Sequence, residues 1–98
     1  MDYLHTSKTL RRIDEEADFD GGFSPGVVKA FRIRMQSIRA ADNENDLRAL
    51  KSLHFEKLKG DRKGDYSIRL NKQFRLTFQI EEGDDGNRIV VLAIEDYH

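Results

Sequence analysis

The stretch Lys57–Phe78, KLKGDRKGDYSIRLNKQFRLTF, decides the fold. Apolar and polar residues alternate in Ser67–Leu70 and again in Phe74–Phe78, which is the period of a half-buried strand. Residues 71–73 lie between these two segments and supply a tight loop. The pattern therefore predicts a β-hairpin with one face toward a core.

Two arginines of this hairpin oppose each other in the predicted register. If Leu70 and Phe74 close the hairpin, Arg69 and Arg75 lie directly opposite on the face away from the core. Like charges opposed across a ladder cost up to about 1 kcal/mol. The pair is therefore expected either to be solvated or to hold an anion, and replacing Arg75 by alanine is expected to leave stability unchanged or slightly higher.

Patterns outside the hairpin predict an α+β fold in a single domain, residues 1–98. Apolar residues at helical spacing predict helices over residues 7–17 and 25–41, and Ser24-Pro25 marks the start of the second. A third, short helix is expected with Asp46 as its N-cap. Strands are expected at residues 2–5, 55–58, 65–70, 74–81 and 88–95. The predicted architecture is two N-terminal helices packed on one face of an antiparallel sheet, with the opposite face left for function.

Two further expectations concern side-chain placement. The last predicted strand is apolar on both faces, so it is expected inside the sheet. The second helix is expected to bury an apolar stripe of Val27, Val28, Phe31, Met35 and Ile38. Its basic residues are expected to face outward: Lys29, Arg32, Arg34 and Arg39.

Composition excludes several classes of protein. Charged residues make up 36% of the chain and hydrophobic residues 38%, which is enough to fold one core. Cysteine is absent, which excludes disulfides, thiolate catalysis and cysteine–zinc sites. The sequence contains neither a signal-peptide pattern nor an apolar run near the roughly 18 residues of a membrane span. A cytoplasmic location away from membranes is expected.

The charge of the chain is unevenly distributed. Residues 46–78 carry 9 basic and 4 acidic side chains, a net charge of +5, whereas residues 79–98 carry 1 basic and 6 acidic side chains, a net charge of −5. A local cluster of positive charge is typical of phosphate binding, so the basic block predicts a nucleic-acid contact. The alternative is a solvated face whose neutralising acids lie nearby in the fold.

The sequence closes on Glu95-Asp96-Tyr97-His98, directly after the predicted buried strand. Histidine transfers protons near neutral pH, so this segment is a candidate acid–base site; alternatively His98 is an exposed residue without a role. The three histidines share no common spacing, and the turn at residues 59–64 lacks the context of a phosphate-binding loop. Neither a metal nor a cofactor is expected.

Four segments together resemble a known family. They are LKGDR at 58–62, SIRLN at 67–71, FRLTF at 74–78 and EDYH at 95–98. The chain resembles the HigB branch of the RelE/ParE superfamily, the toxins of type II toxin–antitoxin systems. The resemblance implies a ribosome-dependent mRNA endonuclease of the RelE-like fold, held in a hetero-oligomer by a HigA-like helix-turn-helix antitoxin.

The resemblance also implies roles for individual residues. Asp96, Tyr97 and His98 match the catalytic ending of the family, Arg75 matches its phosphate-contacting arginine, and Lys59 matches the basic residue of its turn. Some relatives have an active-site histidine three residues before that lysine, where this chain has Glu56. His54 lies two residues earlier, and whether Glu56 or His54 takes that histidine's place is left open.

RNA carries its own nucleophile, the 2′-OH, so the expected mechanism needs no metal. The protein must accept and donate protons and stabilise charge on the phosphate. Arg75 and Lys59, with Arg69 in support, are the candidates for charge stabilisation, and His98 with Glu56 or Asp96 are the candidates for proton transfer. Tyr97 is expected to stack on a base. The residues expected to hold the RNA backbone are Lys57, Arg62, Lys63 and Lys72.

Two other functions remain open from the sequence. One is a non-catalytic protein, either a ParE-like gyrase inhibitor or an inactive toxin whose main role is antitoxin binding. The other is a small basic RNA-binding module without toxicity. The acid–base set at residues 96–98 together with Arg75 favours the endonuclease, since ParE-like members commonly lack that set.

Overall fold

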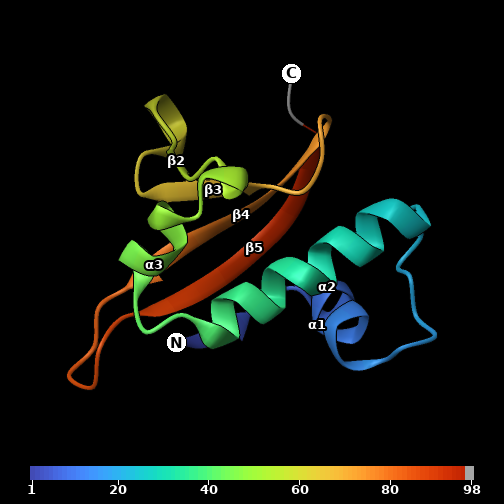
Figure 1. Ribbon diagram of the computed structural model, residues 1–98, viewed down its shortest axis with the longest axis horizontal. Helices are drawn as coiled ribbons and strands as arrows, with labels where there is room; N and C mark the ends of the chain where they lie inside the picture. The colour runs from blue at the N-terminus through green and yellow to red at the C-terminus, as the bar shows by residue number, and fades with distance from the viewer. Residues whose placement is uncertain (97–98) are drawn as a thin grey trace.

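Within residues 1–96, which the computed structural model describes, five strands form one twisted sheet in the order β1-β5-β4-β3-β2 (Figure 1). The strands are β1 (Asp2–His5), β2 (Glu56–Lys57), β3 (Asp65–Arg69), β4 (Phe74–Glu81) and β5 (Arg88–Asp96). Neighbours from β2 to β5 pair antiparallel, as predicted, and β5 lies inside the sheet. Strand β1 pairs parallel with β5, an orientation that the sequence pattern did not predict.

The helices begin where the sequence places capping residues. They are α1 (Lys8–Glu15), α2 (Pro25–Ala40) and α3 (Glu44–Ala49), with short 3₁₀ turns η1 (Lys51–Leu53) and η2 (Gly60–Arg62). The hydroxyl of Ser7 accepts a hydrogen bond from Leu10 N–H, and the hydroxyl of Ser24 accepts one from Val27 N–H. The predicted start of the second helix at Ser24-Pro25 is confirmed, and Ser7 caps the first helix.

The predicted N-cap of the third helix is wrong. Asn43 has the extended backbone of an N-cap, and its side-chain oxygen accepts a hydrogen bond from Asn45 N–H. Asp46 lies inside the first turn of α3, where its carboxylate accepts a hydrogen bond from Asp42 N–H instead. An aspartate in a first turn favours the helix through the helix dipole. Asp46 therefore correctly indicated a helix here, but it lies inside the first turn and not at the N-cap.

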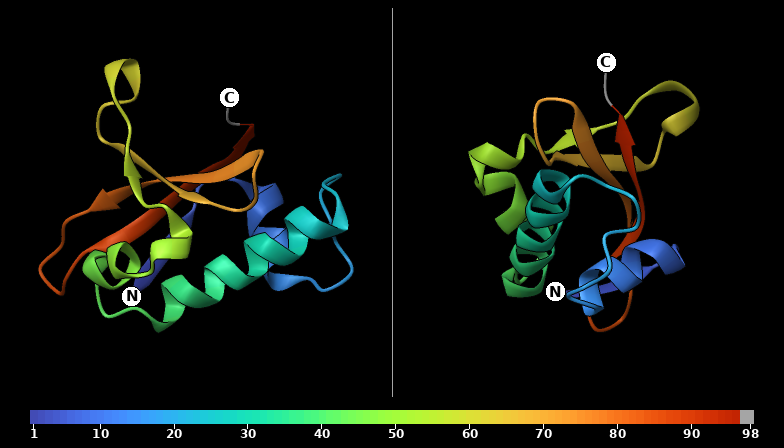
Figure 2. Two further views of the ribbon diagram at one scale, coloured as in Figure 1. Left: turned by 45° about the horizontal axis from the view of Figure 1, so that its top comes forward. Right: turned by 90° about the vertical axis from the view of Figure 1, so that its right-hand side faces the viewer.

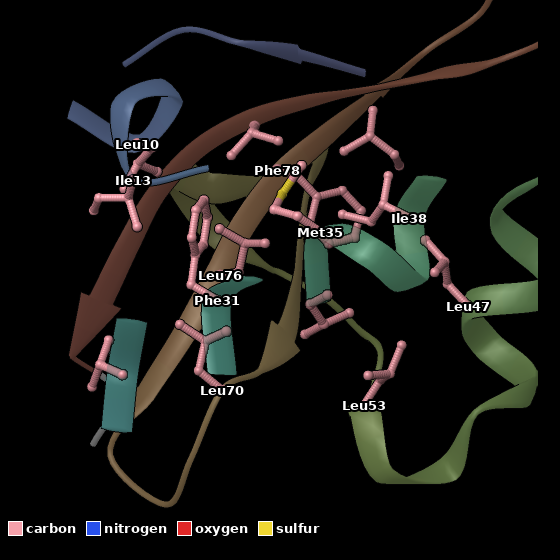
Figure 3. Close-up of a cluster of buried hydrophobic side chains, with 14 of the residues drawn as sticks. Leu10, Ile13, Phe31, Met35, Ile38, Leu47, Leu53, Leu70, Leu76 and Phe78 are labelled. Carbon is pink, nitrogen blue, oxygen red and sulfur yellow. The ribbon is translucent and has the colours of Figure 1, made fainter. Parts of the chain in front are cut away.

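One hydrophobic core lies between the helices and the sheet. Helix α2 runs along one face of the sheet with α1 beside it (Figure 2), and its predicted apolar stripe is buried. The side chains that meet it from the other elements include Leu10, Ile13, Leu47, Leu53, Ile68, Leu76, Phe78, Ile89 and Val91 (Figure 3). Leu47 and Leu53 extend this core from α2 toward β3. No helix in the described part of the chain is both long and apolar enough to cross a membrane.

Three of the four basic residues expected to face outward from α2 tie it to its neighbours, and of these three only Arg39 is exposed as predicted. Arg32 donates hydrogen bonds to the carbonyls of Ile13, Glu16, Ala17 and Phe19, at 2.9, 3.0, 3.2 and 3.1 Å. Helix ends leave carbonyls without an intrahelical partner, and a long arginine stem can reach them along the surface. Arg39 bonds the buried carboxylate of Asp14 and the Tyr3 hydroxyl. Only Lys29 of this set stays exposed without such a bond among the described residues.

We expect Arg32→Met to lower the free energy of unfolding by about 2 kcal/mol, because the methionine keeps much of the stem but leaves the end of α1 without its donor. Urea denaturation followed by circular dichroism measures this loss. Lys29→Met on the same helix is the matched control and should change stability by less than about 0.5 kcal/mol. Equal losses in both variants would show that Arg32 contributes nothing through these carbonyls.

Candidate active site

A row of charged side chains crosses the sheet on the face opposite the helices. Arg69 of β3 pairs with Arg75 of β4, and Arg75 pairs with Glu95 of β5. This confirms the register predicted for the hairpin. Since Leu76 and Phe78 point into the core, the alternation of β4 places Arg75 on the opposite face, called here the open face.

Arg75 is nevertheless buried, with an exposed fraction of 6%. Its Nε donates to Ser67 Oγ at 2.7 Å, and its Nη2 donates to the carbonyl oxygens of His54 and Ser67. The carboxylate of Glu56 lies 3.7 Å from the same Nη2. Of the two alternatives expected for the pair, solvation does not hold for Arg75, because the segment before β2 covers its guanidinium.

His54 has the backbone conformation that brings it to this site. It follows η1 with a left-handed backbone, φ +46°, which is uncommon for a residue with a side chain. Its carbonyl faces Arg75, and its imidazole Nε2 lies 3.2 Å from Arg69 Nη1. Arginine can only donate, so this contact requires an unprotonated Nε2 and places the ring proton on Nδ1. His54 therefore precedes β2 in a turn instead of sharing a regular strand with Glu56.

Arg34 of α2 also reaches this end of the sheet. Its Nε donates to the carbonyl oxygen of Arg69 at 2.8 Å, and burial lowers the pKa of Arg34. Three guanidinium groups thus come from three elements to the end of β3. Sequence reasoning placed Arg34 outside, and its only signal is its position next to the buried Met35 at the flank of the apolar stripe.

The basic arm, residues 57–64 (KLKGDRKG), stands out from the sheet between β2 and β3 (Figure 2). The exposed side chains of Lys57, Lys59 and Lys63 line a hollow of about 270 Å³ with Leu58 and Gly60. Gly60 has φ +65°, a left-handed conformation that favours glycine at this turn. Lys72 lies exposed in the loop between β3 and β4. The lysines expected to bind RNA are therefore accessible, on the two loops at the opposite ends of β3.

Arg62 of the same arm is placed differently from the lysines. Its guanidinium forms ion pairs with Glu95 and Asp65, whose carboxylates also accept hydrogen bonds from Thr77 and Gln79. The hydrogen bonds from Arg62, and then that from Thr77, hold the pKa of Glu95 below its usual value against the opposing effect of burial. Gln79 and then Arg62 likewise lower the pKa of Asp65.

The end of β5 lies beside Arg75 in the sheet. Asp96 pairs with Phe74, next to the Arg75–Glu95 pair, and its carboxylate accepts a hydrogen bond from the Gln73 amide at 3.1 Å. Tyr97 and His98 lie outside the described residues. Within residues 1–96, no group of three histidine, cysteine or acidic side chains is arranged to hold a metal ion. The described site therefore unites Arg75, Arg69, Glu56 and His54, with Asp96 one position away across the sheet.

A profile described as "RelE-like toxin of type II toxin-antitoxin system HigB" matches residues 4–98. This chain belongs to the HigB-like toxin family. Among relatives of this HigB-like toxin, "Endoribonuclease HigB" of Proteus vulgaris is 38% identical over 85 residues, which cover 82% of the chain and 86% of the relative. "Toxin HigB-1" of Vibrio cholerae is 46% identical over 57 residues, which cover 58% of the chain and 60% of the relative.

Solved structures show the same fold at low sequence identity. The "YoeB/ParE toxin from Agrobacterium tumefaciens" superposes with a TM-score of 0.61 at 16% identity, over 100% of both chains. The toxin fold also occurs in the "YoeB-YefM complex from Staphylococcus aureus", with a TM-score of 0.57 at 19% identity, over 100% of this chain and 97% of the other. The predicted α+β architecture of the RelE-like toxins is confirmed.

We expect Arg75→Ala to lower the free energy of unfolding by about 2–3 kcal/mol, because it leaves the Ser67 hydroxyl and two buried carbonyls without a charged donor. Urea denaturation measures the loss, and circular dichroism checks that the fold is retained. Arg69→Ala is the matched control on the opposite strand and should cost less than about 1 kcal/mol, because the Arg69 side chain is less buried. Unchanged stability of Arg75→Ala would restore the expectation from the sequence.

Acid should weaken the Arg62–Glu95 contact. The folded pKa of Glu95 is lowered, so its contribution to stability is complete above the ordinary value of about 4.3 and is lost as the pH falls through the lowered pKa. We expect Glu95→Gln to be less stable than the wild type by at most about 1 kcal/mol at pH 7. The difference should shrink as the pH falls below the ordinary glutamate value of about 4.3, as measured by denaturation at a series of acidic pH values. A difference that is independent of pH would contradict an ionic role for Glu95.

Proposed function

We propose that this HigB-like toxin is an endoribonuclease that cleaves mRNA on the ribosome and so inhibits translation. The observation that carries the proposal is the cluster of Arg75, Arg69 and His54 beside the strand end that leads into Asp96. A pair of cations next to an imidazole suits a reaction that builds charge on a phosphate and moves a proton. The relative named as an endoribonuclease supports the same activity.

The reaction follows from the chemistry of RNA. A base removes the proton of the 2′-OH, and the resulting oxygen attacks the adjacent phosphorus in line. The new O2′–P bond forms while the P–O5′ bond breaks, and an acid protonates the departing 5′ oxygen. The products are a 2′,3′-cyclic phosphate and a 5′-OH end. Because the substrate supplies the nucleophile, the proposed reaction is independent of metal ions and cofactors.

Three cations are assigned to the phosphate site. Arg75 is held by Ser67 and the His54 carbonyl, so its charge is already in place when RNA binds. A preorganised charge in a partly buried site stabilises a developing anion more than a mobile surface charge does. Arg69, opposite Arg75, and Lys59 of the basic arm complete the proposed phosphate site.

Proton transfer is assigned to His98, with Asp96 or Glu56 as its partner group. His54 is the second candidate for the base, because its imidazole lies beside Arg69 at the same site. Tyr97 is assigned to stacking on a base, a contact worth about 1–3 kcal/mol. Lys57, Lys63 and Lys72 are assigned to the RNA backbone, where contacts position the strand and carry no sequence information.

The proposed partner is a HigA-like helix-turn-helix antitoxin that forms a hetero-oligomer with this chain. Membership in a toxin–antitoxin family supports a protein partner, as does the structural neighbour whose title names a toxin in complex with YefM. The proposed place of action is the cytoplasm, where translating ribosomes are found.

We expect wild-type protein to cut a defined mRNA on assembled ribosomes and to leave 5′-OH ends. An mRNA with a 2′-O-methyl group on the nucleotide before the cut should not be cleaved at that position, because its nucleophile is blocked. Sequencing gels with kinase labelling of 5′-OH ends detect both results. Cleavage of the blocked RNA at an unchanged rate would exclude attack by the 2′-OH.

Two variants then separate the candidate bases. His98→Ala should lower the cleavage rate by about 10²-fold or more if His98 transfers the proton, whereas His54→Ala should have a smaller effect. The reverse order would assign the proton transfer to His54. Growth arrest by wild-type protein without RNA cleavage, but with inhibited gyrase, would support the ParE-like alternative.

A further inference from the structure

The guanidinium group of Arg62 is occupied by carboxylates on every nitrogen. Nη1 and Nη2 donate to the two oxygens of Glu95 at 2.9 and 2.7 Å, a bidentate pair, and Nε donates to Asp65 Oδ2 at 2.8 Å. Planar two-point contacts of this kind are among the stronger and more directional ion pairs in proteins. These hydrogen bonds use three of the five N–H groups of Arg62 and set two carboxylates against its charge, which weakens its attraction for a phosphate.

Both carboxylates are themselves fixed to the sheet. The Thr77 hydroxyl of β4 donates to Glu95 Oε2 at 2.6 Å, and the Gln79 amide donates to Asp65 Oδ1 at 2.8 Å. The three residues Arg62, Glu95 and Asp65, called here the Arg62 clasp, therefore connect the basic arm to strands β3 and β5. The Arg62–Glu95 contact spans 33 positions of sequence and links the arm to the residue before Asp96.

Exposure distinguishes the clasp from a chance surface contact. The side chains of Arg62 and Glu95 are 40% and 35% exposed, and Asp65 is 12% exposed. An isolated surface pair adds little to stability, but a half-buried network with fixed partners restricts the orientation of the loop that carries it. Here that loop also carries Lys57, Lys59 and Lys63.

We propose that Arg62 and Glu95 are positioning residues of the RNA site: the clasp holds the basic arm over the open face, so that its lysines meet the RNA, and Arg62 does not itself bind phosphate. The substrate class follows from the proposed function, on which this inference rests. The clasp also neutralises two carboxylates of the open face that would otherwise repel the RNA backbone next to Arg75.

Glu95→Gln distinguishes this role from simple electrostatics by the sign of its effect. Removing a negative charge near the RNA should strengthen binding if charge alone matters. If Glu95 holds the arm, the same change should weaken binding and slow cleavage although the protein becomes more positive. The variant keeps a side chain of the same size, leaves Arg62 paired with Asp65, and alters none of the residues proposed to touch RNA.

The first measurement requires no RNA. Trypsin cuts after Lys57, Lys59 and Lys63, and all three sites are intact in Glu95→Gln. We expect the arm of this variant to be cut about threefold faster or more than in the wild type under native conditions, because the arm opens more often. Arg88→Gln is the matched control: it removes an arginine–glutamate pair between β4 and β5 at the opposite end of the sheet and should leave arm cleavage unchanged.

The second measurement uses a defined single-stranded RNA and, for cleavage, programmed ribosomes. We expect Glu95→Gln to slow cleavage by about tenfold, within the range that misplaced binding groups cost an enzyme. Arg62→Gln should also weaken binding, and its RNA affinity should show the same salt dependence as that of Glu95→Gln, because both changes release the same lysines. If Arg62 itself bound a phosphate, the logarithmic salt slope of Arg62→Gln would be smaller than that of Glu95→Gln by about 0.7 for a single strand.

The double variant Arg62→Gln/Glu95→Gln completes the cycle. It should be no worse in cleavage than the more severe single variant, because both changes break the same contact. Faster or unchanged cleavage by Glu95→Gln, a smaller salt slope in Arg62→Gln than in Glu95→Gln, or additive losses in the double variant would each overturn the proposal. If wild-type protein neither binds nor cleaves RNA, the proposed function fails. The trypsin measurement tests the clasp separately: an unchanged cleavage rate in Glu95→Gln would show that the clasp does not hold the arm.

Discussion

The antiparallel pairing of β4 with β5 is the contact on which the rest of the structure depends. These two strands form the centre of the sheet, with β3 and β2 added on one side and β1 on the other. Their register sends Leu76 and Phe78 into the core against α2 and leaves Arg75 facing Glu95 on the other side. A shift of one residue would exchange these faces, burying charge under the helices and exposing the core.

The sequence was most informative where one face of an element is buried. The alternation in the hairpin predicted the opposed arginines, and the apolar stripe of α2 and the capping serines predicted two helices close to their observed limits. Each of these signals is local, because the period of side-chain direction and the preference for a cap depend on a few neighbouring residues. The candidate site was predicted in part: the pattern placed Arg69 and Arg75 on the same face but could not show what covers them.

Apart from the N-cap of α3, the unpredicted features depend on contacts between distant segments. Arg75 is buried because the turn at His54 folds over it, and strand β1 adopts its direction only by docking against β5. A period of two tells which way a side chain points, but it does not tell whether another segment covers that face. Charge counting has the same limit, because it does not show which charges are paired. Within the +5 block, Arg62 pairs with Glu95 and Asp65, which fits the alternative that neutralising acids lie nearby. The lysines of the same block are exposed at the surface.

The parallel pairing of β1 with β5 has a consequence for folding during synthesis. The first strand to be synthesised finds its sheet partner only after nearly the whole of the described chain has been made, so its contact has a high sequence separation and forms slowly relative to local helices. A nascent chain that ends at β4 lacks β5, and therefore lacks the Glu95 end of the charged row that Arg69 and Arg75 begin. The emerging polypeptide therefore completes this row only after its last strand has left the exit tunnel of the ribosome that makes it.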